Sequence, residues 1–96
     1  MFVIRNVFQC KPGKAGQVIE KFKAAHALIA DSGVKPRVLV DQVASFWTVV
    51  VEVEVDDIGA FDRLMHDRAS RDDVKAAMAG YMDLVESGYR EIYRIA

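Results

Sequence analysis

The stretch VKPRVLVDQVASFWTVVVEVEV, residues 34–55, decides the fold of this chain. In its second half, Phe46–Val55, apolar side chains at the odd-numbered positions alternate with mixed ones, which is the clearest strand pattern in the sequence. The first half, Val34–Val43, is also rich in β-branched residues, but Pro36 cannot donate a hydrogen bond to a neighbouring strand. The stretch therefore predicts two consecutive strands joined by a tight connection at Ala44–Ser45, with the Pro36 strand at a sheet edge.

A helix is predicted on either side of this pair of strands. Before it, from about Lys14 to a break at Asp31–Gly33, apolar residues recur at steps of four and three, the spacing of a buried helix stripe: Val18, Phe22, Ala25 and Ile29. After it, Asp56 and Asp57 offer carboxylates to the unpaired amides of a helix N-terminus. The apolar stripe of this second helix begins with Ile58, Phe61 and Met65.

The second helix is predicted to be broken. A polar segment, Asp67–Ser70, interrupts its stripe, and Ser70–Asp73 resembles a capping box with Asp in place of Glu. Helical spacing then resumes at Val74, Met78, Tyr81 and Val85. Ser87–Gly88 is the predicted C-terminal cap of this second part of the helix.

The two ends of the chain alternate as strands do, at Phe2–Gln9 and at Tyr89–Ile95. The complete order is strand, helix, strand, strand, helix, strand in 96 residues. This order predicts an α+β, ferredoxin-like βαββαβ fold with a four-stranded antiparallel sheet, in one domain that spans residues 1–96.

Composition excludes several classes of function. The formal net charge is -1 and both signs are scattered, so the chain lacks the basic stripe that binds nucleic acid. The longest apolar run, around Phe46–Val51, is far too short to span a membrane. The single cysteine, Cys10, excludes an internal disulfide and favours a cytoplasmic location. His26 and His66 lack the spacing of metal ligands, and we expect neither a metal nor a cofactor.

One face of the sheet is predicted to take the helices and the other to pack on a second copy of the chain. The helix-facing sets are Phe2, Ile4 and Phe8 with Trp47, Val49, Val51, Val53 and Val55. The other face is mixed, with Val3, Val7, Phe46, Val50 and Ile92 beside Arg5, Arg90, Arg94, Glu52 and Glu54. Such a face suits a sheet-on-sheet homodimer. The alternative is the solvated face of a monomeric antiparallel sheet.

The chain resembles the dimeric α+β barrel superfamily, in particular its antibiotic-biosynthesis-monooxygenase-like branch. The resemblance covers the whole chain and rests on the strand order, the length, the aromatic-rich third strand and the segment Phe61–Gly88. It implies a homodimer whose sheets pack face to face, with a pocket in each subunit between its own sheet and helices. Superfamily members include cofactor-independent monooxygenases, heme-degrading enzymes, isomerases, decarboxylases and proteins with no assigned activity.

Asn6 and His26 are the candidate catalytic residues. Asn6 is the one polar member of the first strand's apolar face, where an amide without partners costs about 1–3 kcal/mol. The resemblance implies that such an asparagine orients oxygen or substrate; the alternative is an amide bonded to backbone or water at a sheet irregularity. His26 falls about 40 degrees beyond Phe22 around the first helix, where it faces either the pocket or water.

Large apolar side chains are expected to line the pocket: Phe22, Trp47, Phe61, Met65, Met78 and Tyr81. At helix and strand spacing, the alternative for these residues is a simple core. The heme-degrading relatives place a tryptophan and a histidine ligand on the second helix, where this chain has Leu64 and Met78. Heme degradation is therefore disfavoured.

Two functions remain open from the sequence. The first is a cofactor-independent monooxygenase-like or isomerase-like enzyme for a small aromatic or polyketide-like substrate, in which Asn6 positions an oxygen and His26 or Tyr81 handles a proton. The second is a non-catalytic ligand-binding or stress-response assembly module. The fold alone does not choose between them.

Overall fold

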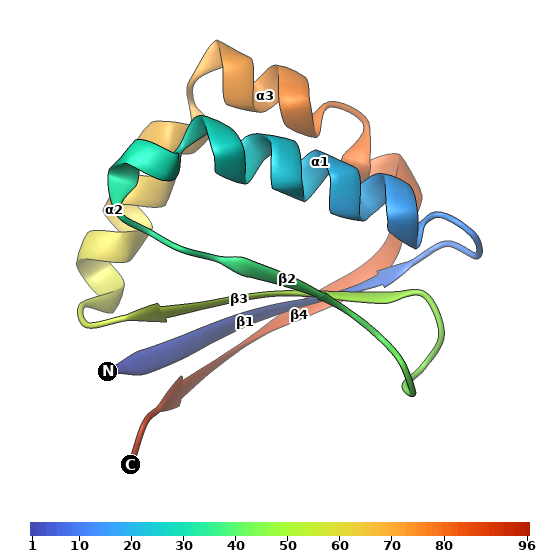
Figure 1. Cartoon of the computed structure of the whole chain (residues 1–96), viewed down its shortest axis with the longest axis horizontal. Coiled ribbons are helices and arrows are strands. Elements are labelled where there is room, and N and C mark those ends of the chain that lie inside the picture. The colour runs from blue at the N-terminus through green and yellow to red at the C-terminus, as the bar shows by residue number, and fades with distance from the viewer.

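A four-stranded antiparallel sheet carries all three α-helices on one of its faces in the computed structural model, which describes residues 1–96 (Figure 1). The strands are β1 (Phe2–Cys10), β2 (Arg37–Val40), β3 (Thr48–Val55) and β4 (Val85–Arg94). The α-helices are α1 (Ala15–Leu28), α2 (Ile58–Ala69) and α3 (Asp72–Met78), and short 3-10 turns occupy Ala30–Ser32 and Tyr81–Leu84. The predicted α+β class, the element order and the antiparallel sheet are confirmed.

The spatial order of the strands is β2-β3-β1-β4, so β1 and β3 are central and β2 lies at an edge, as Pro36 predicts. The register places Asn6 of β1 opposite Val51 of β3 on one side and Arg90 of β4 on the other. Paired residues point to the same face of an antiparallel sheet. Asn6, Val51 and Arg90 therefore form one row beneath the helices.

The main core lies between α1 and the central strands. Val18 of α1 and Val49 of β3 are 0% exposed, and Phe22 and Val51 pack in the same cluster. Cys10 is buried here as well, and its burial together with the nearby Asp41 carboxylate raises the pKa of the thiol. The side chain of Lys21 ties α1 to the end of α3, because its Nζ donates to the Ala79 carbonyl at 2.6 Å.

The predicted break in the second helix is confirmed, but its capping is different. α2 begins at the predicted cap, where the Asp57 carboxylate accepts from the Ala60 amide at 2.9 Å. Ser70, expected to cap the next helix, instead donates its hydroxyl to the Asp67 carbonyl at 2.7 Å and completes α2. The N-cap position of α3 is Arg71. The capping-box interpretation was wrong because Ser70 serves the helix before it.

The second part of that helix is shorter than predicted. α3 ends at Met78, and Gly80, with φ of 82°, turns the chain into a left-handed conformation that stops the helix. Val85 and the predicted cap at Ser87–Gly88 lie inside β4. Glycine suits this position because a Cβ would sit 3.0 Å from the Val7 carbonyl oxygen, a tight contact.

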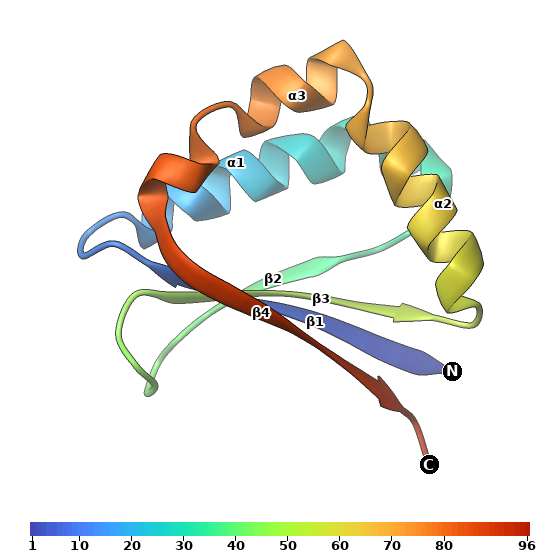
Figure 2. The ribbon, with the colours of Figure 1, turned by 180° about the vertical axis from the view of Figure 1, so that it is seen from behind.

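Phe46 and Trp47 lie outside β3, contrary to the sequence prediction. They end the loop between β2 and β3 with φ of 56° and 54°, a left-handed conformation that breaks the strand. The Trp47 carbonyl accepts from the Cys10 amide at 2.9 Å, which holds the loop to β1. Both ribbon views show the loop curling away from the helices, toward the open side of the sheet (Figure 2).

The two faces of β4 are reversed relative to the prediction. Arg90, Ile92 and Arg94 share the face of Asn6, Ile4 and Phe2 beneath the helices, whereas Tyr89, Glu91 and Tyr93 lie on the open face. The prediction failed because both sets of alternating residues in β4 mix apolar and charged side chains. Only pairing with β1 decides between them.

No helix in the structure combines the length and the apolar character required to cross a membrane.

Candidate functional site

A cavity of about 360 Å³ lies between the sheet and the helices. Its floor comes from β1, β3 and β4, including Ile4, Val53 and Ile92, and its walls come from α1, α2 and α3. Most of the lining side chains are hydrophobic. The volume falls in the range of small-molecule sites, about 300–1,000 Å³.

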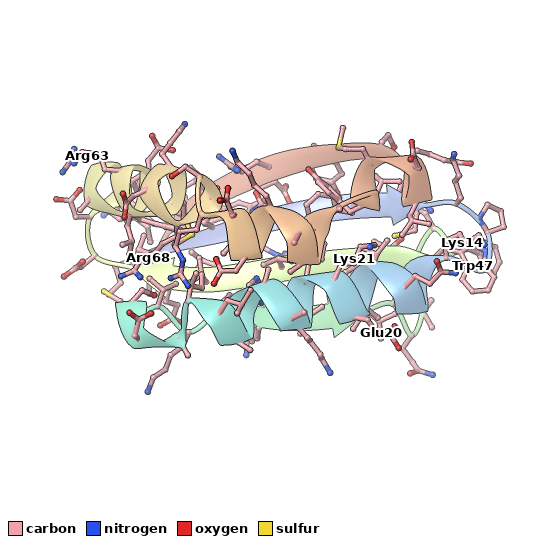
Figure 3. The ribbon with its side chains drawn as sticks, turned by 90° about the horizontal axis from the view of Figure 1, so that it is seen from above. Lys14, Glu20, Lys21, Trp47, Arg63 and Arg68 are labelled. Atoms are coloured by element: carbon pink, nitrogen blue, oxygen red, sulfur yellow. The ribbon has the colours of Figure 1, made fainter.

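The cavity brings together most of the residues that the sequence singled out. Asn6, His26, Phe22, Phe61, Met65 and Met78 all line it. Tyr81 lies outside, because it packs against the rings of Phe8 and Phe22 with centroids 6.5 and 6.0 Å away. Trp47 also lies outside, 43% exposed, at the same end of the molecule as Lys14 and opposite Arg68 (Figure 3).

The Asn6 amide is held by an arginine that sequence reasoning placed on the wrong face. Arg90 donates from Nε to Asn6 Oδ1 at 2.6 Å, across the β1–β4 ladder. This bond settles the orientation of the amide, since only Oδ1 accepts, and leaves the Nδ2 hydrogens free to donate. The signal that identifies Arg90 is its register with Asn6, which is a property of the folded sheet.

His26 lines the cavity from α1 as a half-buried ring. It stacks on Phe22, with ring centroids 6.1 Å apart and planes 22° apart. Burial lowers the pKa of the His26 imidazole below its usual 6.5, so the ring is neutral at neutral pH. A neutral imidazole has one nitrogen that accepts a proton and one that donates.

The polar groups that α2 contributes are partly paired, and Arg68 Nε is buried without a hydrogen-bond partner. Arg68, which lines the cavity, forms an ion pair with Asp31 at 3.3 Å, and this contact joins α2 to the turn after α1. The carboxylate of Asp62 lies 3.6 Å from His66 Nδ1, one helical turn away. The His66 side chain is 81% exposed and takes no part in the cavity.

The arrangement therefore combines an apolar chamber with a small polar group on the sheet. The Asn6–Arg90 pair presents donors, the neutral His26 ring can exchange a proton, and no group of three or more His, Cys, Asp or Glu side chains is placed to hold a metal ion. Such a site can bind a small aromatic molecule and hold one of its oxygens.

Solved structures share this fold along the whole chain. An uncharacterized NIPSNAP domain protein from Burkholderia xenovorans is 14% identical with a TM-score of 0.83, over 100% of this chain and 95% of its own. A "putative antibiotic biosynthesis monooxygenase" from Chloroflexus aurantiacus is 12% identical with a TM-score of 0.74, over 99% and 93%. A protein from Shewanella oneidensis is 26% identical with a TM-score of 0.64, over 96% and 87%.

No family model and no curated protein sequence matches the chain. The structural similarities establish that this is an α+β protein with the fold of the NIPSNAP domain and of the antibiotic-biosynthesis-monooxygenase-like structure. The resemblance drawn from the sequence is thereby confirmed for the fold.

Proposed function

We propose that this protein is a cofactor-independent, monooxygenase-like or isomerase-like enzyme that acts on a small aromatic or polyketide-like molecule in the cavity. The observation that supports this most is that Asn6 and His26 line the same apolar chamber. The apolar lining of the cavity strengthens the polar contacts made inside it.

In this proposal Asn6 positions an oxygen, either of the substrate or of molecular oxygen, through its free Nδ2 hydrogens. His26, neutral at neutral pH because burial lowers its pKa, takes or returns a proton. Tyr81, the other candidate for the proton, packs against Phe8 and Phe22 outside the cavity. The proton role therefore falls to His26.

A non-catalytic ligand-binding or assembly module is the second candidate. One observation favours it: the residue bonded to Asn6 is an arginine, which stays protonated in proteins and cannot act as a base. If no proton moves at the Asn6–Arg90 pair, the same geometry serves binding alone.

We also propose that the protein is a homodimer assembled through the open face of the sheet. Leu39, Val50, Val7 and Tyr89 form an apolar row across all four strands on this face. Tyr89 is 62% exposed and Tyr93, on the same face, is 50% exposed. Tyrosine-rich, partly apolar surfaces are characteristic of protein interfaces, and a second copy of the sheet supplies a matching apolar row. A cytoplasmic location, supported by the single cysteine, belongs to the same proposal.

The proposed function is tested by a ligand screen, followed by a turnover assay of the compounds that bind. Aromatic and polyketide-like compounds are screened for a rise in Tm, and the compounds that bind are incubated aerobically while oxygen uptake and product mass are followed. The proposal predicts turnover that Asn6→Ala abolishes while the variant keeps the wild-type fold and Tm within a few degrees. Binding without turnover supports the module, and a panel without binders contradicts both functions.

A further inference from the structure

Arg90 differs from several other arginines of this protein in having no carboxylate partner. Arg5 and Arg37 pair with Glu52, Arg68 pairs with Asp31, and Arg71 pairs with Asp73. Arg90 takes part in none of the protein's ion pairs, and its one side-chain partner is the neutral amide of Asn6. The cavity wall, to which the Asp62 carboxylate also contributes, therefore carries a guanidinium with no carboxylate within ion-pair distance.

The free nitrogens of the Asn6–Arg90 pair are all donors. The Nε–Oδ1 bond occupies one of the two acceptor positions of the amide oxygen, and it leaves the Asn6 Nδ2 group and the two terminal nitrogens of Arg90 unbonded. These nitrogens carry only hydrogens to donate. A ligand that reaches them must bring acceptors, and a charged guanidinium binds anionic acceptors best, often through two parallel hydrogen bonds.

The position of Arg90 keeps the desolvation cost of such a contact low. β4 is an edge strand (Figure 2). Arg90 is exposed although it lines the cavity. An anion bound there keeps part of its hydration, which avoids most of the desolvation cost of a buried ion pair. The apolar remainder of the cavity, lined by Ile4, Phe22 and Met65, lies further in and suits a ring.

We infer that the natural ligand is a planar aromatic carboxylate whose acid group binds Arg90 and Asn6 at the cavity mouth and whose ring enters the apolar chamber. The inference rests on the proposed function, because it names the ligand class for the same cavity. It adds that recognition depends on charge and that Arg90 is the specificity-determining residue.

The experiment compares two isosteric probes, 2-naphthoate and 2-naphthamide, by isothermal titration calorimetry on the full chain. Wild-type protein binds the acid roughly tenfold or more tightly than the amide, since hydrogen bonds to charged groups are the stronger ones. Arg90→Gln removes this preference. The matched control is Arg94→Gln, because Arg94 is exposed, lies on the same strand and face, and does not line the cavity. We expect the Arg94→Gln variant to keep the preference for 2-naphthoate over 2-naphthamide.

Each other outcome overturns the inference. Equal binding of acid and amide by wild type removes the charge requirement but leaves the cavity as a ligand site, so the proposed function survives. If Arg90→Gln and Arg94→Gln lose the preference for the acid equally, the preference comes from the overall positive charge of the strand, and Arg90 has no specific role. Binding of neither probe overturns the assigned ligand class, and the broader screen then decides the proposed function separately.

Discussion

Arg5 of β1 and Glu52 of β3 face each other on the open side of the sheet, with Arg5 Nε 3.2 Å from a Glu52 carboxylate oxygen. Arg37 of β2 pairs with the same carboxylate from the other side, and Glu91 of β4 completes the row beside Arg5. Four side chains of alternating sign thus cross all four strands. Arg5 and Arg37 pair with Glu52, and the Glu91 carboxylate accepts from the Tyr93 hydroxyl at 2.6 Å, so these four side chains find partners within the subunit beside the adjacent apolar row.

A charge placed in that apolar row should separate the proposed dimer. Val7 lies between Val50 and Tyr89 in the row, so Val7→Asp would bury an unpaired carboxylate at a sheet-on-sheet contact. Sedimentation velocity at micromolar concentration should show a dimer for wild type and a monomer for this variant. The control is Ala27→Asp on an exposed position of α1, which should remain dimeric. A monomeric wild type contradicts the dimer.

The loop before β3 stores backbone strain that a glycine should relieve. Phe46 holds φ of 56°, and its side chain is 76% exposed, so it gains little packing in return. Phe46→Gly should raise the free energy of unfolding by up to about 1 kcal/mol, because glycine adopts this conformation without penalty. Urea unfolding at one fixed protein concentration measures the change.

Val43 provides the control for that substitution. It lies in the same loop and is 94% exposed, but its φ is not positive. Val43→Gly therefore relieves no strain and adds only flexibility to the unfolded chain, which lowers stability slightly. If both variants shift the urea midpoint equally, the strain at Phe46 does not contribute to stability.

The half-buried His26 should make stability depend on pH. Because burial lowers the pKa of His26 in the folded state, the unfolded chain binds a proton first as pH falls below its usual value of 6.5. Stability is therefore lost as pH falls from 6.5 toward the lower folded-state pKa, and it is regained as pH rises. His26→Gln should flatten the dependence of Tm on pH between about pH 7 and pH 5.

His66 is the matched control because its side chain is 81% exposed and lies outside the cavity. His66→Gln should keep the wild-type slope of Tm against pH. An unchanged slope in His26→Gln would show that the imidazole has no different proton affinity in the folded protein, and the proton role proposed for His26 would lose its basis.

Much of the fold follows from local pattern. Neighbouring residues indicate the alternation of Val49, Val51, Val53 and Val55, the stripe of α1 and the cap at Asp57. They also indicate the edge position of β2, which follows Pro36. Side-chain period and hydrogen-bonding capacity act over one or two turns or strand repeats, so they can be read without the tertiary structure.

The structural features that the sequence analysis did not predict depend on residues far away in the chain. The face that Arg90 occupies depends on its pairing with Asn6, 84 residues earlier, because both alternatives in β4 are amphipathic. Trp47 left the predicted strand because two successive residues adopt positive φ, which the valine-rich pattern gives no reason to expect. The cavity residues from α1 and α2 were found because large apolar side chains mark the buried faces of helices; the arginine was missed because charge usually marks the outer face.

A substitution at Asn6 can test whether an unneutralised Arg90 is what selects an acid. Asn6→Asp places a carboxylate where the amide oxygen accepts from Arg90 Nε at 2.6 Å, so the protein then supplies its own anion. This variant should remain folded, lose roughly tenfold or more in affinity for 2-naphthoate and keep its affinity for 2-naphthamide, as measured by calorimetry. If the variant still binds the acid, Arg90 is not the counter-ion of the acid. If it loses affinity for both probes equally, Asn6 contributes to the packing of the cavity and not to the selection of an acid.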